Sequence, residues 1–275
     1  MTTQTATLVL AGSRPGADPL LEGTGLASKA LLPIGGKPML AHVLATLRDS
    51  PEVGQITVVA QDTATLAADP QIASVAQKVE WSDSSGSIAD AVSMVLDSAA
   101  GPLFVTTADN VLLTPAMVAQ FLWEGAGSDV AVGLVSRKTV EHAGYSSART
   151  WLKFRGDQWS GANLFRLAGP QVLPLIEFWR SLEQDRKKGM KIVGAFGPAI
   201  LFGALLRLID IHAFAARVAA RFGLAGKVVP MAAAEACIDA DKPSDVPVIE
   251  AILAGRQASS SARSTAASAS DSSSL

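Results

Sequence analysis

The feature that most constrains this chain is a short apolar run followed by a glycine turn near the N-terminus. Leu8, Val9 and Leu10 are consecutive apolar residues, with a polar stretch before them and the segment AGSRPG at 11–16 after them. A short continuous apolar run is typical of a strand buried on both faces of a parallel sheet. The sequence therefore predicts an α/β protein whose first strand ends in a loop of small residues.

That loop is a candidate phosphate site. Small residues let the backbone approach a ligand, and exposed backbone N–H groups suit phosphate. Arg14 and Lys29 add two cations to the same connection, and Pro38 then opens an apolar-periodic helix. We therefore expect the loop to cradle a nucleoside triphosphate. The candidate nucleotide-binding residues here are Leu10, Ala11, Gly12, Ser13, Arg14 and Lys29.

Two further stretches carry carboxylates in informative positions. In the stretch 101–110 an apolar strand runs to a small residue and ends in Asp109, and the carboxyl ends of strands in open α/β sheets are where ligands bind. Asp109 is therefore the best candidate metal ligand, although aspartate also forms turns. Near the C-terminus, alternation places Asp239 and Asp241 on the same side of an extended backbone. Two such carboxylates would suit Mg²⁺, with Asp241 alternatively serving only to cap the last helix.

The chain resembles the MobA-like NTP transferase family in these three stretches. The resemblance rests on LAGSRPG at 10–16 with SKALLPIGGKPML at 28–40, on the strand-end Asp109, and on DADKPSD at 239–245, which is similar to the family's closing DIDTPEDL. Their order along the chain is more specific than any one of them, because a lone glycine loop is weak evidence. The resemblance implies a Rossmann-like, GT-A type fold: a mostly parallel mixed sheet flanked by helices.

The resemblance also implies roles for individual residues. Asp109 and Asp239 would bind Mg²⁺ with Asp241 in support, and Arg14, Lys29 and Asp109 would be catalytic. The loop before the helix at 88–96 would hold the nucleoside through Ser85 and Gly86, although an ordinary capped loop explains those residues equally well. Two residues of the hairpin expected at 150–165 would contact the acceptor; these are Lys153 and Asn163.

The activity implied is transfer of a nucleoside monophosphate from an NTP to a phosphorylated small-molecule acceptor, with release of pyrophosphate. Mg²⁺ would offset the repulsion between two anionic substrates. Three other functions remain open: a GT-A glycosyltransferase that uses a nucleotide-sugar, a non-catalytic nucleotide-binding module, and a membrane-surface enzyme that acts on a lipid head-group precursor, which only the segment 192–206 suggests.

Composition sets the remaining boundaries. A chain of 275 residues with 49% hydrophobic and 17% charged residues can form one sizeable core. The formal net charge of −2 offers no electrostatic case for a nucleic-acid partner. Cys237 is the only cysteine, which fits a reducing compartment, and the N-terminus lacks the basic region of a secretory signal. We therefore expect a cytoplasmic protein.

Residues 1–255 are expected to form a single nucleotidyltransferase domain, with a helical insertion at about 171–223. Within it, the uncharged segment 192–206 is too short for a bilayer span, which needs about 20 apolar residues. A buried helix is the first interpretation of this segment, and contact with a membrane surface is the second. Residues 256–275 are nearly all Ser and Ala and are expected to be a disordered tail.

Overall fold

The computed structural model describes residues 4–13, 16, 18–84, 86–99, 101–145, 149–184 and 206–271. The strands are β1 (Thr5–Leu10), β2 (Pro33–Ile34), β3 (Lys37–Pro38), β4 (Val53–Ala60), β5 (Val79–Asp83), β6 (Leu103–Thr107), β7 (Val130–Ser136), β8 (Leu152–Lys153), β9 (Gln158–Leu167) and β10 (Gly226–Pro230). The α-helices are α1 (Met39–Arg48), α2 (Thr63–Ala67), α3 (Pro70–Ala73), α4 (Ile88–Ser98), α5 (Pro115–Gly125), α6 (Arg137–His142), α7 (Leu173–Gln184), α10 (Ile211–Ala220) and α11 (Asp245–Asp271). The same described residues include three short 3₁₀ helices: η1 (Lys29–Leu31), η2 (Pro170–Val172) and η3 (Ala234–Cys237).

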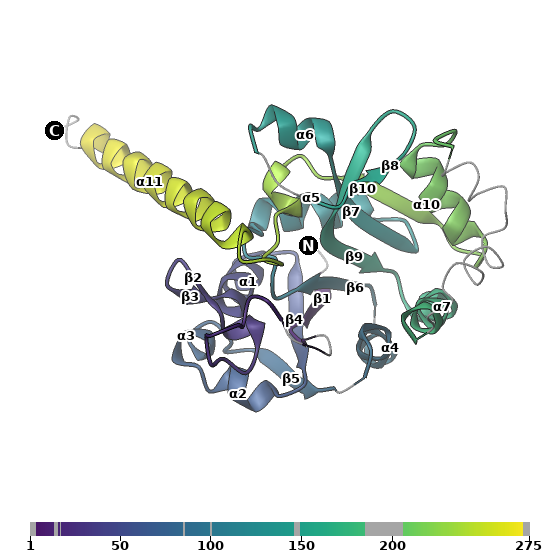
Figure 1. Cartoon of the computed structure of the whole chain (residues 1–275), viewed down its shortest axis with the longest axis horizontal. Coiled ribbons are helices and arrows are strands. Elements are labelled where there is room, and N and C mark those ends of the chain that lie inside the picture. Colours follow the sequence, from purple (N-terminus) through teal and green to yellow (C-terminus); the bar gives the residue numbers. More distant parts are fainter. Residues whose placement is uncertain are drawn as a thin grey trace.

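The centre of the molecule is an eight-stranded mixed sheet (Figure 1). Its strand order is β10-β7-β9-β6-β1-β4-β5, with β8 paired to β9. β1 lies between β4 and β6 and is parallel to both, while β9 is antiparallel to β6 and β7. Parallel neighbours on both sides of β1 mean that the chain crosses the sheet in two directions, and the crevice at such a switch point is the usual ligand site of an open α/β sheet.

Helices cover both faces of this sheet. One core joins Val9 and Phe104 to apolar residues of α1 and α5, and the other joins Leu8 and Val105 to residues of α4 and α10. Leu8 and Val9 are fully buried on opposite faces, as the uninterrupted apolar run predicted. The Rossmann-like α/β architecture expected from the sequence is therefore confirmed.

The hairpin expected at 150–165 is present as β8 and β9, and the insertion contains α7 and α10. Of the segment 192–206, only Leu206 lies within the described residues, so its predicted buried or membrane-surface helix lies outside them. No helix in the described part of the chain is long and apolar enough to cross a membrane.

The C-terminal segment differs from the expectation of a disordered tail. The structure continues α11 through this segment to Asp271, as a helix that extends away from the body of the molecule (Figure 1). Two physical reasons account for the helix. Extension of an existing helix avoids the cost of nucleation, and alanine has the highest intrinsic helix propensity.

Candidate active site

Four loops meet at the carboxyl edge of the parallel strands. Gly12 follows β1, Gln61 follows β4 and Asp109 follows β6, and these three strands are neighbours in the sheet. The segment between η3 and α11 reaches the same edge, because the backbone N–H of Ala240 donates a hydrogen bond to the carbonyl of Asp109 (3.2 Å). Residues from the first and last parts of the chain therefore share one site.

Lys29 is the central cation of this site. It belongs to η1, whose first turn is capped by the Ser28 side chain. Its ammonium nitrogen lies 2.8 Å from Oδ2 of Asp109 and 3.4 Å from Oδ1 of Asp241, and it donates a hydrogen bond to the carbonyl of Ala240 (3.3 Å). Lys29 thus joins the strand-end aspartate to the C-terminal Asp-x-Asp segment.

Burial and charge act on the Lys29 ammonium in opposite directions. Burial alone would lower the pKa of Lys29, but the carboxylates of Asp109 and Asp241 outweigh it, so its pKa is raised above the ordinary value. Lys29 therefore stays charged at neutral pH and is available to neutralise a phosphate.

Asp109 is held on both of its oxygens. Oδ2 accepts from Lys29, and Oδ1 accepts from the hydroxyl of Thr107 (2.5 Å). Thr107 is the last residue of β6, so the strand itself orients the carboxylate that follows it. The Asp109 side chain is only 14% exposed, which leaves it directed into the site rather than into solvent.

Asp239 has a separate pair of partners. Nη1 of Arg149 donates to its Oδ1, and Nδ2 of Asn163 donates to its Oδ2, both at 2.9 Å. Burial raises the pKa of Asp239, the nearby charges of Asp241 and Asp109 add to this rise, and the Arg149 guanidinium opposes it. Three carboxylates thus gather beside two cations, which leaves the cluster with an excess of negative charge.

The glycine loop is fastened to the loop after β4. The side chain of Gln61 accepts a hydrogen bond from the backbone N–H of Ser13 (2.9 Å) and donates one to the carbonyl of the same residue (3.0 Å). A Cβ added at Gly12 would lie 3.0 Å from Nε2 of Gln61, so glycine allows this close contact. The loop therefore has a defined backbone position next to the carboxylate cluster.

The donor set of the site favours a hard cation over a soft one. Among the described residues, no group of three or more His, Cys, Asp and Glu side chains is arranged to hold a metal ion. Each carboxylate oxygen of Asp109 and Asp239 accepts one hydrogen bond from a described residue and so keeps capacity for a further partner. Mg²⁺ commonly binds through one or two carboxylates with phosphate oxygens and water. Asp109 and Asp239 fit that pattern, with water or the phosphates of a nucleotide as the other ligands.

The structure brings together Lys29, Asp109, Asp239, Asp241 and Asn163, which the sequence analysis proposed for three different roles. Arg14 and Ser85 lie outside the described residues. Lys153 lies exposed on β8, and no hydrogen bond or ion pair joins it to the three aspartates among the described residues. Gly86 lies in the loop before α4, where the Ser87 side chain and Asp90 form a capping box.

The sequence analysis missed two residues, Gln61 and Arg149. Gln61 follows a strand end directly, the same positional signal that identified Asp109, and could have been found in that way. Arg149 lies in an irregular segment before β8, with no periodicity or motif around it. Its contact with Asp239 joins segments 90 residues apart, which local patterns do not encode.

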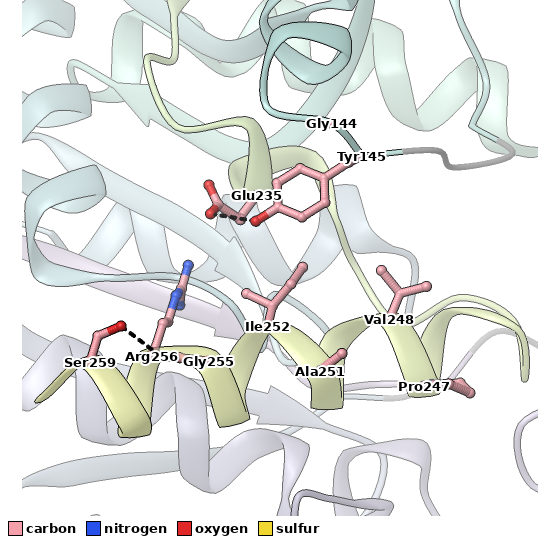
Figure 2. A pocket seen from close by; sticks show the side chains of 10 residues that line it. All are labelled: Gly144, Tyr145, Glu235, Pro247, Val248, Ala251, Ile252, Gly255, Arg256 and Ser259. Carbon is pink, nitrogen blue, oxygen red and sulfur yellow. Dashed lines mark hydrogen bonds between the residues drawn. The ribbon is translucent and has the colours of Figure 1, made fainter. Parts of the chain in front are cut away.

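A groove of about 1180 Å³ runs along α11. Figure 2 shows its walls: Val248, Ile252 and Arg256 on the helix, facing Tyr145 and Glu235 across the groove. The Tyr145 hydroxyl donates to Glu235 (2.9 Å), and burial raises the pKa of Tyr145. The groove contains none of the residues of the carboxylate cluster.

Known proteins share this architecture. A hypothetical transferase from Thermus thermophilus is 21% identical, with a TM-score of 0.71 over 89% of this chain and 100% of that chain. CMP:2-keto-3-deoxy-manno-octonic acid synthetase complexed with CTP is 14% identical, with a TM-score of 0.54 over 93% of this chain and 100% of that one. The 4-diphosphocytidyl-2C-methyl-D-erythritol synthase from Anaerococcus prevotii is 11% identical, with a TM-score of 0.54 over 92% and 99% of the two chains. At these identities the likeness shows a shared fold.

Sequence comparison gives the family itself. No curated protein matches the chain significantly. The sequence model of the MobA-like NTP transferase domain, however, matches residues 8–169, which is more than half of the chain and includes the glycine loop, Lys29 and Asp109. The chain belongs to the MobA-like NTP transferase family.

Proposed function

We propose that this protein transfers a nucleoside monophosphate from an NTP to a phosphorylated small molecule and releases pyrophosphate. The observation that carries the proposal is the position of Lys29, which contacts Asp109 and Asp241 at the strand ends beside the glycine loop. A cation held among carboxylates at this edge suits a reaction in which the reacting groups are all anionic.

In the proposed reaction, an oxygen of the acceptor phosphate attacks the α-phosphorus of the NTP. A new P–O bond forms, the bond from the α-phosphorus to the α–β bridging oxygen breaks, and pyrophosphate leaves with that electron pair. The attacking oxygen is already a nucleophile, so alignment and charge neutralisation contribute most of the catalysis. No strong general base is required, in keeping with the absence of histidine from the described site.

Lys29 and the glycine loop would act on the leaving group. Lysine is a compact charge on a flexible stem, so the Lys29 ammonium is able to turn from Asp109 to a phosphate oxygen. The backbone N–H of Gly12 would donate to the phosphates, while that of Ser13 is bound by the Gln61 side chain and holds the loop in position. Arg14, which follows them in the sequence, would add a second cation.

We further propose that Asp109 and Asp239 hold Mg²⁺, with Asp241 in support. A bound Mg²⁺ would supply Lewis-acid polarisation of the α-phosphate and reduce repulsion between the substrates. Asn163 would act on this site through Asp239 rather than as an acceptor contact, because its amide is committed to that carboxylate.

CTP is the first nucleotide to test, because the synthetase named above is complexed with CTP and the synthase has a 4-diphosphocytidyl product name. The decisive experiment measures pyrophosphate release with Mg²⁺ and each of the four NTPs against a panel of phosphorylated sugars, alcohols and cofactor precursors. Release that requires one NTP and one acceptor together is expected.

Two controls separate the proposal from other functions. Asp109→Asn is expected to abolish release while the melting temperature stays close to that of the wild type. Transfer of sugar from a nucleotide-sugar, without pyrophosphate release from any NTP, would instead identify a glycosyltransferase. NTP binding with no release across the whole panel would contradict the proposed transfer.

A further inference from the structure

Asp239 differs from the other two aspartates of the site in the residues that bind its carboxylate. Lys29 serves Asp109 and Asp241, whereas Asp239 is bound by Arg149 on one oxygen and by Asn163 on the other. The Arg149 side chain is 8% exposed and that of Asp239 19%, so this contact is shielded from solvent. A buried carboxylate bound on both oxygens has little freedom to rotate.

The backbone at Asn163 is shaped for this contact. Asn163 has a φ of 53°, in the left-handed region that asparagine tolerates better than most residues. It lies where β9 pairs irregularly with β7: Val132 faces Phe165, but Leu134 faces Gly161, so β9 contains extra residues there. Bulges of this kind redirect a side chain next to active sites. The flanking Ala162 and Leu164 are buried, which fixes the irregular backbone in place.

The guanidinium of Arg149 binds Asp239 through Nη1 but leaves a second donor, Nε, without a partner among the described residues. This Nε is buried. A buried donor without a partner lowers stability, and such groups in native proteins often mark a functional constraint. The guanidinium is thus held against Asp239 despite that penalty.

We infer that Arg149 and Asn163 form a clamp that positions Asp239, and that this positioning sets the affinity of the site for a divalent cation. The inference rests on the proposed role of Asp239 as a ligand of the cation. Each oxygen of the Asp239 carboxylate accepts one hydrogen bond from the clamp. The carboxylate is thereby held in one orientation, and its remaining lone pairs are available to the cation. Loss of a residue that orients a metal ligand typically weakens metal binding about 10–100-fold. Arg149 and Asn163 are positioning residues in this scheme, because they act through Asp239.

The test uses the full chain without nucleotide and Mn²⁺ as the probe, with binding followed through the EPR signal of free Mn²⁺. Arg149→Lys keeps the charge but loses the guanidinium geometry, and Asn163→Gly keeps the left-handed backbone but loses the amide. Each is expected to weaken Mn²⁺ binding by at least about 10-fold. Arg48→Lys, at an exposed ion pair on α1, is the matched control and should bind as the wild type does. Asp239→Asn gives the Mn²⁺ affinity of the site without the Asp239 carboxylate.

The outcomes separate the clamp from the proposed function. Wild-type affinity in both Arg149→Lys and Asn163→Gly, beside a clear loss in Asp239→Asn, would overturn the clamp and leave the role of Asp239 intact. Wild-type binding no tighter than that of Asp239→Asn would overturn both. Asn163→Ala adds a check on folding: it should bind Mn²⁺ as weakly as Asn163→Gly but melt at a lower temperature, because alanine is strained at a φ of 53°.

Discussion

At the scale of single residues, the site is a set of ion pairs with unequal surroundings. Among the residues that the structure describes, Lys29 has three acceptors within 3.4 Å, whereas Arg149 has one carboxylate partner and a buried Nε with no partner. The two cations therefore differ in the number of their partners. In the proposed mechanism Lys29 would exchange a carboxylate for a phosphate, whereas Arg149 would stay on Asp239.

Lys29→Ala is expected to lower kcat/KM for pyrophosphate formation by about 100-fold or more, because it removes a charged donor from a site where negative charge develops. Lys78→Ala removes an exposed lysine far along the chain and should leave the rate unchanged. Steady-state kinetics on both variants provide the measurement. A Lys29→Ala enzyme with wild-type kcat/KM would refute the role of this lysine.

His42 gives the fold a dependence on pH. It lies on α1, with Nε2 2.8 Å from the carbonyl of Ile34, and burial lowers the pKa of His42 below its ordinary value of 6.5, with Lys37 adding to the effect. The unfolded chain therefore takes up a proton at a higher pH than the folded one. The folded state is therefore most stable where His42 is neutral in both states, above about pH 7. The free energy of unfolding decreases as the pH falls through 6.5, where the unfolded chain begins to bind the proton.

His42→Gln should accordingly show a smaller loss of stability than the wild type between pH 7.5 and 5.5. Urea denaturation at these two pH values measures the free energy of unfolding for both proteins. Equal pH dependence in the two proteins would show that His42 does not contribute. Within the described part of the chain, the hydrogen bond of the His42 ring is to the carbonyl of Ile34 and not to the carboxylates of the site, so the readout is stability rather than turnover.

At the scale of elements, the site depends on how loops at neighbouring strand ends are joined. Gln61, which follows β4, makes two hydrogen bonds to the backbone of Ser13, which follows β1. The two strands that carry these loops are paired, with Thr7 to Leu10 opposite Ile56 to Val59. A loop held in this way on a rigid sheet would keep one arrangement, which would lower the entropy lost when an NTP binds.

Gln61→Ala is therefore expected to raise the KM for the NTP about 10-fold with little change in kcat, since it loosens the loop without removing a reacting group. Gln71→Ala, which removes an exposed glutamine bonded to the carbonyl of Gly36, is the matched control. A fall in kcat at unchanged KM would place Gln61 in the chemical step instead. Initial-rate measurements over a range of NTP concentrations distinguish the two.

At the scale of the whole molecule, two cores on opposite faces of the sheet hold the strand ends in place. Phe121 on α5 is fully buried and packs on Phe104 of β6, with ring centroids 5.7 Å apart. Trp123, two residues further along the same helix, is 84% exposed. One helix thus offers a buried and an exposed aromatic residue for direct comparison.

Phe121→Ala is expected to lower the free energy of unfolding by about 3–5 kcal/mol, because it removes packing and leaves a cavity. Trp123→Ala should change it by less than about 0.5 kcal/mol. Urea denaturation of both variants measures the difference. Similar losses in the two variants would contradict the arrangement of this core.

The parts of the molecule that were predictable are those encoded over short distances. Apolar runs identified β1 and β6, and strand ends in a parallel sheet share one edge. Asp109 lies just beyond β6, and Lys29 lies on the long connection that follows β1. The C-terminal tail was less predictable from composition, since Ser and Ala fit both a disordered segment and the extension of a helix that α11 shows.

What the sequence by itself determined is the α/β architecture, the edge of the sheet at which the loops gather, and the presence of both cations and carboxylates there. These follow from local periodicity and from the geometry of parallel strands. The tertiary structure alone decided which cation serves which carboxylate. Lys29 reaches Asp241 across 212 residues and Arg149 reaches Asp239 across 90. Such pairs depend on the distance between folded segments, which no local pattern in the chain specifies.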